Sequence, residues 1–278
     1  MKFIIITVCT AALLISANVI DNNSTVVKSK EIVEPSSTIA LDQYRVIKVN
    51  GQIVYTKSGK DMHQGDVFAS NASLKFKTSE SRAAVISKLK GRKILTAKSS
   101  KGNKATLLPA MNGLSTRSGG IVNLLDLKNH FNGSYLVIDE AKVKIGGKDF
   151  TQGKGNFFFL RYDYNGETIN KKLSSSEDSL ILNPDEIFKI DGKSIDGSKI
   201  NAVKLYYRNG SKSQYINQFA PQFVKGDDLK MEVQIIIEEL KDKEKKEKTD
   251  EVTSYLIENY AKPGRDNLNW YLENNFKM

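Results

Sequence analysis

The sequence predicts an α+β protein in which two small antiparallel β modules, each a barrel or a sandwich, precede a C-terminal helical segment. Short runs of alternating apolar and polar residues, separated by Gly, Ser and Asn, extend to about residue 225 and are typical of β modules. The phrase Gly-Lys-Asp-Met-His-Gln-Gly at residues 59–65 returns 88 positions later, at 147–153, with five of its seven positions identical. After Gly226 the apolar period changes from two to about 3.6, which indicates helices.

The N-terminal residues 1–17 have the layout of a secretory signal peptide: one charge at Lys2, an apolar run over 3–15, and small residues before an expected cleavage after Ala17. The alternative is an uncleaved anchor, but the run is shorter than the roughly 20 apolar residues that span a bilayer. Residues 18–43 are polar and show no sustained period, so we expect a flexible tether.

Cys9, the only cysteine, lies in the middle of this apolar run. Removing the signal peptide would leave no thiol, which excludes disulfides, thiolate nucleophiles and Cys-based zinc sites from the mature chain. Cys9 follows Val8 and not a small residue at the end of the run, so we do not expect a lipid anchor. A disulfide-free exported chain rich in Lys, Ile and Asn favours a bacterial periplasm or outer cell envelope.

The first β module is expected at residues 44–110 and the second at 134–225, with a Gly- and Ser-rich linker over 111–133 between them. In each module the repeated phrase is interpreted as the turn that joins two strands. Asn-Gly pairs at 165–166 and 209–210 predict hairpin turns. The expected strands lie at 44–49, 52–57, 74–76, 83–86 and 93–95, and then at 135–138, 142–145, 156–162, 180–182, 186–190 and 202–207.

Three amphipathic helices are expected over residues 226–278. Asp227 is the predicted N-cap of the first, the second is marked by Asp250 and stops at Pro263, and the third is short. Residues 227–262 carry eleven acidic and seven basic side chains. Because short helices cannot bury their faces alone, we expect them to pack on the second β module, although the aromatic face of the last helix is also a candidate docking surface.

Two histidines are available for catalysis, His63 and His130. The repeat places Thr151 where His63 stands, so an exposed turn residue is the simpler interpretation. His130 is close in sequence to Asp126 and Ser134, but no Gly-x-Ser-x-Gly motif supports a catalytic triad.

Two carboxylates, Asp61 and Asp149, recur with the repeated phrase, and together with Asp163 they are candidates for glycoside hydrolysis. Capping of a tight turn also explains them, and a positive φ angle explains Gly65 and Gly153. No phosphate-binding loop or dinucleotide fingerprint is present. We therefore expect no catalytic residue, no cofactor and no metal ligand.

The chain has a formal net charge of +10, and seven basic residues fall within residues 88–104. A solvated strand face is one interpretation, and a surface for anionic polysaccharide or lipid head groups is another. Nucleic acid is not expected, because the protein is exported and this window lacks aromatic residues for base stacking. The predicted interaction surface comprises Lys88, Lys90, Arg92 and Lys93, with Trp270, Tyr271 and Phe276 of the last helix.

Residues 44–100 resemble the extracytoplasmic β-domain of the FecR family. The resemblance rests on Gly51-x-Ile53, Gly59, Met62, Gly65-Asp66-Val67-Phe68, Ser81-Arg82-Ala83-Ala84-Val85 and Gly91-Arg92-Lys93-Ile94-Leu95. In FecR proteins this domain follows a cytoplasmic anti-sigma segment and a membrane span, which residues 1–43 do not resemble. The resemblance therefore implies a sensing or scaffolding module and does not extend to signalling across the membrane. The second module departs further, with Lys154 where Asp66 stands.

These observations lead to a functional hypothesis: a non-enzymatic, exported bacterial envelope protein that serves as a platform for protein interaction, scaffolding or sensing, with another envelope protein as its partner. Two alternatives remain open. One is an envelope-glycan hydrolase that uses the turn carboxylates, and the other is a module that binds a polyanion or polysaccharide.

Overall fold

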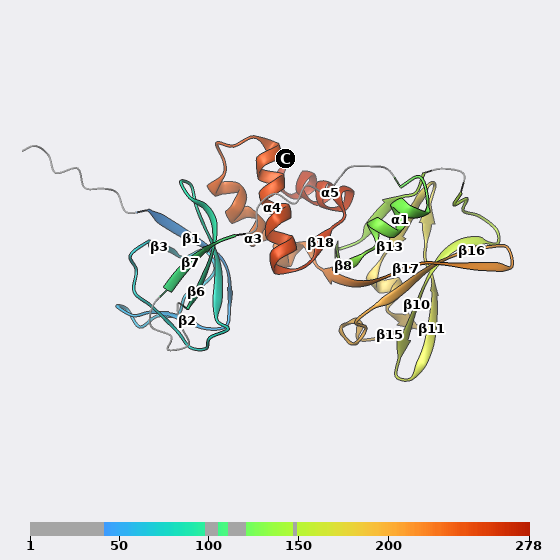
Figure 1. Ribbon diagram of the computed structural model, residues 1–278, viewed down its shortest axis with the longest axis horizontal. Helices are drawn as coiled ribbons and strands as arrows, with labels where there is room; N and C mark the ends of the chain where they lie inside the picture. The colour runs from blue at the N-terminus through green and yellow to red at the C-terminus, as the bar shows by residue number, and fades with distance from the viewer. Residues whose placement is uncertain (1–41, 98–104, 111–120, 147–148) are drawn as a thin grey trace, which may run out of the picture. The chain divides into compact units, whose positions relative to one another are not determined.

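A computed structural model describes residues 42–97, 105–110, 121–146 and 149–278 (Figure 1). These residues form an α+β fold with mostly antiparallel sheets and a C-terminal helical region, as predicted. The predicted signal peptide, all but two residues of the tether, Lys98, Lys101 and Lys104 of the basic stretch, and Gly147 and Lys148 of the second phrase lie outside the described residues.

The first module contains two antiparallel sheets, ordered β3-β1-β5-β6-β7 and β2-β4, that share one core. Apolar side chains from both sheets, such as Ile53 and Phe76 of the small sheet and Val46 and Val85 of the large one, are buried in that core. The strands are β1 (Gln43–Asn50), β2 (Ile53–Tyr55), β3 (Val67–Ala69), β4 (Leu74–Phe76), β5 (Arg82–Ser87), β6 (Gly91–Ala97) and β7 (Ala105–Pro109).

The second module contains a six-stranded sheet in the order β11-β10-β16-β17-β8-β18, a three-stranded sheet β12-β13-β9 and a small ribbon β14-β15. Its elements are α1 (Leu124–His130), β8 (Gly133–Ile138), β9 (Ala141–Lys144), β10 (Asn156–Tyr164), β11 (Glu167–Lys172), β12 (Ser175–Ser176), β13 (Ser179–Leu182), α2 (Pro184–Ile187), β14 (Lys189–Ile190), β15 (Lys193–Ser194), the 3₁₀ turn η1 (Gly197–Lys199), β16 (Val203–Asn209) and β17 (Lys212–Val224).

Two predictions for the second module are corrected. The module is not wholly antiparallel, because β8 pairs in parallel with both β17 and β18 (Lys262–Pro263). The strand expected at 186–190 is found only at its end, as β14, because its first two residues complete the helix α2. Pro184 starts this helix at its first position, and the Asn183 side chain caps it by accepting from the backbone N–H of Asp185.

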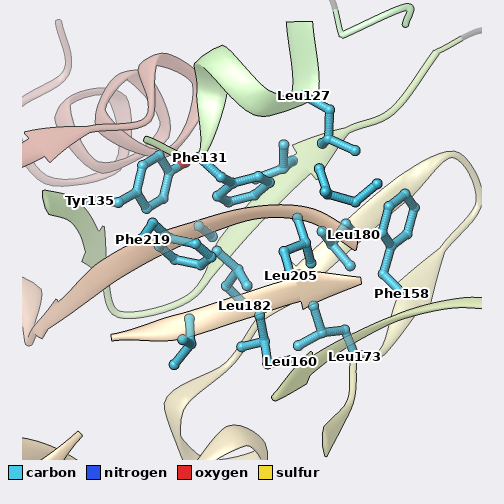
Figure 2. Packing of buried hydrophobic residues seen from close by; sticks show 14 of the residues in the cluster. Leu127, Phe131, Tyr135, Phe158, Leu160, Leu173, Leu180, Leu182, Leu205 and Phe219 are labelled. Atoms are coloured by element: carbon cyan, nitrogen blue, oxygen red, sulfur yellow. The ribbon is translucent and has the colours of Figure 1, made fainter. Parts of the chain in front are cut away.

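The predicted linker over residues 111–133 is also wrong for its described part. Helix α1 lies over the sheet, and its Leu127, together with the following Phe131, is fully buried against Tyr135 and Phe219 (Figure 2). Residues 121–133 are therefore part of the second module, with Ile121, Leu127 and Phe131 in its core. Figure 2 shows that Phe158 and Leu160 of β10 and Leu205 of β16 point into the same core.

The repeated phrase connects two different sheets in both modules and is not a hairpin turn. It leads from β2 to β3 in the first module and from β9 to β10 in the second. Its fourth residue, Met62 or Phe150, is buried in the core of its own module. Gly65 has the expected positive φ of 87°, whereas in the second module the positive φ of 87° is found at Gly155 and not at Gly153.

The helical segment consists of α3 (Gly226–Glu239), α4 (Lys245–Asn259) and α5 (Arg265–Phe276), drawn in orange to red in Figure 1. Asp227 is not the N-cap of α3, because the helix begins one residue earlier. The Asp139 carboxylate, from the turn after β8, accepts a hydrogen bond of 2.8 Å from the Gly226 N–H and supplies the cap instead. Helix α4 begins at Lys245, five residues before the predicted Asp250.

The helices pack on both β modules and not on the second alone. One core cluster joins Ile47 and Ile86 of the first module with Leu136 and Ile138 of β8 and with the buried side chains of α3, α4 and α5. Asn267 of α5 fastens the helices to β8: its side chain accepts from Ile138 N (2.8 Å) and donates to Ile138 O (3.0 Å). The helical segment therefore connects the two modules.

Candidate functional site

The basic surface predicted on the first module is partly internal. Arg92 on β6 has a fully buried side chain, and its Nε donates to Glu251 of α4 at 2.6 Å while its Nη1 donates to Glu258. Its guanidinium also lies 5.8 Å from the ring centre of Tyr255. Arg92 is therefore not part of an exposed interaction surface, because the helices cover the sheet at this position.

The lysines of the predicted surface behave differently from Arg92. Lys88 and Lys90 are exposed at the β5–β6 turn, and Lys93 is half-buried. Lys90 lies 3.2 Å from Asp42, whose pKa is held below its usual range by the Ser87 hydroxyl and then by Lys90. Lys88 forms no ion pair with any described residue.

Two further cations of the first module meet carboxylates of α3. The buried Glu232 carboxylate lies 3.2 Å from Lys48 Nζ and accepts hydrogen bonds from the Tyr255 (2.7 Å) and Tyr260 (2.8 Å) hydroxyls. Burial raises the pKa of both tyrosines, and the charge of Glu232 raises it further. These contacts hold the helices and the first module together.

Arg45 forms the remaining contact of this kind, at 2.6 Å from Glu238, and its hydrogen bond lowers the pKa of that carboxyl. All three cations come from the β sheet and all the carboxylates from the helices, so the charges on either side are complementary. We call this set the ionic interface; it comprises Arg45, Lys48 and Arg92 with Glu232, Glu238, Glu251 and Glu258.

The aromatic residues predicted on the last helix divide in the same way. Tyr271 is fully buried and its hydroxyl donates to Gly226 O at 2.8 Å, so it is a core residue and not a docking residue. Phe276 is half-buried, with its ring 5.8 Å from that of Tyr271. Trp270 is 55% exposed and remains a candidate contact residue.

The candidate catalytic carboxylates do not share partners. Asp61 accepts hydrogen bonds from the Gln52 amide at 2.8 and 3.0 Å, Asp163 accepts from the Thr168 hydroxyl at 2.7 Å, and Asp149 is exposed. His63 is exposed, as expected, and lies with Asp61 in a shallow hollow on the first module.

His130 forms no triad with its neighbours in sequence. Its Nε2 lies 2.8 Å from the Tyr135 hydroxyl, and burial lowers its pKa to about 4. The Asp126 carboxylate instead accepts a hydrogen bond of 3.2 Å from the Val122 N–H. Within the described part of the chain, no group of three His, Cys, Asp or Glu side chains is placed to hold a metal ion.

A surface that the sequence analysis missed lies on the six-stranded sheet. Phe158 and Leu160 point into the core, so the alternating residues Phe157, Phe159 and Arg161 of β10 lie on the opposite face. We call this surface the aromatic–cationic face; it comprises Phe157, Phe159, Arg161, Lys172, Lys204, Tyr206, Arg208 and Tyr215.

The strand register arranges these side chains in three rows across neighbouring strands. In the middle row, Lys172, Phe159, Tyr206 and Tyr215 are successive partners. The Phe159 and Tyr206 rings are stacked at 5.0 Å with an interplanar angle of 11°. Arg161 pairs with Lys204 in one outer row, and Phe157 pairs with Arg208 in the other.

Both arginines are held in place by the surrounding structure. The guanidinium of Arg161 lies 4.8 Å from the ring centre of Tyr206, and its Nε donates to Asn170 Oδ1 at 2.8 Å. The Nε of Arg208 donates to Gly210 O at 2.9 Å. Aromatic rings and these hydrogen bonds therefore orient the two guanidinium groups.

The four cations of this face have no counterion among the residues that the structure describes: no carboxylate lies within ion-pair distance of Arg161, Lys172, Lys204 or Arg208. Lys172, Lys204 and Arg208 are exposed and Arg161 is half-buried. Arg161 and Lys204 are direct cross-strand partners, an arrangement of like charges that destabilises a sheet.

Comparison with known proteins adds no relative: no family model, curated protein or solved structure matches the chain. The resemblance of residues 44–100 to the FecR domain therefore stays a prediction. No helix in the described ranges is both long and apolar enough to cross a membrane.

Proposed function

We propose that this chain is a non-enzymatic, exported protein of the bacterial envelope that acts as a binding platform, with the aromatic–cationic face as its binding surface. The observation that carries the proposal is the set of four cations on that face without a described counterion. Unpaired cations add little to the stability of the fold, whereas they increase the affinity and the association rate of a ligand of opposite charge.

The helical segment supports this proposal by joining the two modules. The ionic interface ties α3 and α4 to the first module, and β18 and Asn267 tie the segment to β8. A preorganised surface loses less conformational freedom on binding than a mobile one. In this account the helices provide the scaffold, and Trp270 is a second contact point for a partner protein.

The alternative function, hydrolysis of envelope glycans, requires two carboxylates about 5 to 10 Å apart on either side of a substrate. Asp61 and Asp163 are each occupied by a neighbouring side chain, Gln52 and Thr168, which favours structural roles for both. If the purified chain cleaves envelope glycans and Asp61→Asn abolishes this cleavage, the protein is a hydrolase and not a binding platform.

The platform is tested by retention of the purified chain on isolated envelope fractions. The variant Arg161→Gln/Arg208→Gln removes two charges from the face. Its matched control, Lys88→Gln/Lys93→Gln, removes two charges from the first module. We expect the face variant to lose most of its retention and the control to keep it. Equal retention of the face variant and the unmodified chain would contradict the proposal.

A further inference from the structure

We propose that the aromatic–cationic face binds a linear acidic polysaccharide through the carboxylate groups of its sugars. This inference rests on the proposed function, because it takes the same face as the binding surface, and it adds the chemical class of the ligand.

The charge of the face selects an anion. Its three rows carry four cations, and the nearest acidic position on the same face of β10 is Asp163, which is hydrogen-bonded to Thr168. The cross-strand pair of Arg161 and Lys204 places like charges side by side. An anionic group bound between them would turn this repulsion into two attractive contacts.

The donors of the two arginines point to carboxylates. In both Arg161 and Arg208 the Nε–H is used internally, on Asn170 and on Gly210 O respectively. No described residue accepts a hydrogen bond from the terminal amino groups of either guanidinium. Two parallel N–H groups fit the two oxygens of a carboxylate, and the guanidinium is already oriented, so less freedom is lost on binding.

The spacing of the rows requires more than one anionic group. Lys204 and Arg208 lie four residues apart on β16, which corresponds to about 13 Å along a strand. A ligand with a single carboxylate cannot contact both outer rows. A polymer with regularly repeated carboxylates can contact both, and it can also meet Lys172 at the edge of the middle row.

The aromatic rings favour sugars over nucleic acid. Arg161 lies over the Tyr206 ring, Lys172 lies 5.0 Å from the Phe157 ring centre, and Phe159 is stacked on Tyr206. Stacking of nucleic-acid bases requires free ring faces, which these contacts occupy. Tyr215, 46% exposed, keeps an apolar ring and a hydroxyl available for one sugar unit.

The burial of the aromatic side chains on this face disfavours a membrane surface as its ligand. Binding to a bilayer uses large apolar side chains that protrude into the lipid. On this face Phe159 is buried, and Phe157 and Tyr206 are half-buried between cations. The aromatic residues therefore serve to position charge and do not project as membrane anchors.

The test measures binding of the full chain to an oligogalacturonate long enough to span the three rows. Neutral maltooligosaccharide, single-stranded poly(dT) and phosphatidylglycerol vesicles serve as comparison probes. We expect oligogalacturonate to bind most tightly, with an affinity that falls steeply as salt is added. Arg161→Gln/Arg208→Gln should weaken binding at least about tenfold, because each substitution removes charge-assisted hydrogen bonds to a carboxylate. Lys88→Gln/Lys93→Gln should bind as the unmodified chain does.

Two further variants guard against a folding artefact. Lys172→Gln and Lys204→Gln remove exposed charges that form no hydrogen bond with a described residue, and each should weaken binding severalfold without lowering the stability of the fold. Arg161→Lys keeps the positive charge but loses the two parallel N–H donors of the guanidinium. Its affinity for oligogalacturonate should lie between that of the unmodified chain and that of Arg161→Gln.

The possible failures are distinguishable. If the face variant loses envelope retention but oligogalacturonate does not bind, the ligand class is wrong and the binding platform stands. Binding of poly(dT) that equals or exceeds that of oligogalacturonate, and that the face variant abolishes, would assign the face to nucleic acid and overturn the inference. Unchanged envelope retention of the face variant would overturn the platform itself.

Discussion

The ionic interface and the aromatic–cationic face use the same residue types for different ends. In the interface, Arg92 is fully buried between Glu251 and Glu258. On the face, Arg161 and Arg208 are oriented by rings and by their Nε–H groups, and no described carboxylate pairs with them. A basic residue of this chain is therefore structural where helices cover its sheet and available for binding where the sheet faces solvent.

A single sheet shows the same contrast. At the β8 end of the six-stranded sheet, Leu136 and Ile138 on the outer face are covered by the helices. At the other end, around β10 and β16, the outer face carries aromatic and cationic residues and is open at Lys204 and Arg208. The covered end is apolar because it is a core, and the open end is charged because it faces solvent.

Removing Arg92 should produce the largest effect. Arg92→Ala removes a fully buried guanidinium that donates to Glu251 and Glu258, and we expect the free energy of unfolding to fall by about 3–5 kcal/mol. The matched Lys88→Ala, at an exposed position, should change it by no more than about 0.5 kcal/mol. Denaturant titration measures both, and a loss below about 1 kcal/mol for Arg92→Ala would contradict a structural role for Arg92.

Charge removal on the face should affect binding and not stability. Arg161→Gln/Arg208→Gln is expected to lose envelope retention while its free energy of unfolding stays within about 0.5 kcal/mol of that of the unmodified chain. Parallel sedimentation and denaturant titration test this. A large loss of stability in the face variant would place these arginines with Arg92 as structural residues.

Acid should distinguish the two regions as well. The pKa of Glu238 is lowered mainly by its hydrogen bond from Arg45, so this contact stabilises the fold above the usual carboxyl pKa. Its contribution is lost as the pH falls through the lowered pKa. Arg45→Gln should therefore flatten the acid limb of the stability profile, whereas Arg161→Gln should leave that limb unchanged.

His130 provides a background common to both acid experiments. Its folded pKa of about 4 lies below the usual value of 6.5, so the unfolded state binds the proton more readily. The contribution of neutral His130 to the free energy of unfolding is fully present above about pH 6.5, and it declines toward pH 4 in either variant. Circular dichroism should show the same decline in the free energy of unfolding for Arg45→Gln and Arg161→Gln across this range. The two variants should differ from each other only at lower pH.

The smallest expected effect concerns the like-charge pair. Lys204→Gln removes the repulsion between neighbouring strands and should raise the free energy of unfolding by a few tenths of a kcal/mol. Lys88→Gln, which has no cross-strand cation, is the matched control. Differential scanning calorimetry would reveal the sign, and destabilisation by Lys204→Gln would mean that its side chain has a structural role.

Much of this architecture was predictable from local pattern. A continuous aromatic and aliphatic run marked β10, and Asn165-Gly166, both with positive φ, formed the expected hairpin. That turn fixes Phe159 opposite Lys172, so half of the aromatic–cationic face was accessible from hairpin register. The other half was not, because β16 and β17 turn one residue later than predicted and contain a bulge beside Tyr206.

The errors at Arg92 and Tyr271 have a different cause. Nothing in the basic stretch distinguishes Arg92 from Lys88, and its burial depends on α4, more than 150 positions away in sequence. The sequence shows the excess of acidic residues in the helices, but it does not show that these residues face the basic side chains of the first module. The helix cap from Asp139 was hidden for the same reason, since its partner Gly226 is 87 positions distant.

The most direct test of the central claim is the rate at which phenylglyoxal modifies each arginine, followed residue by residue with mass spectrometry. We expect Arg208 and Arg161 to react readily and Arg92 to resist modification, and we expect oligogalacturonate or an envelope fraction to protect only Arg208 and Arg161. Modification of Arg92 as fast as Arg208, or protection that leaves Arg161 and Arg208 unchanged, would contradict it.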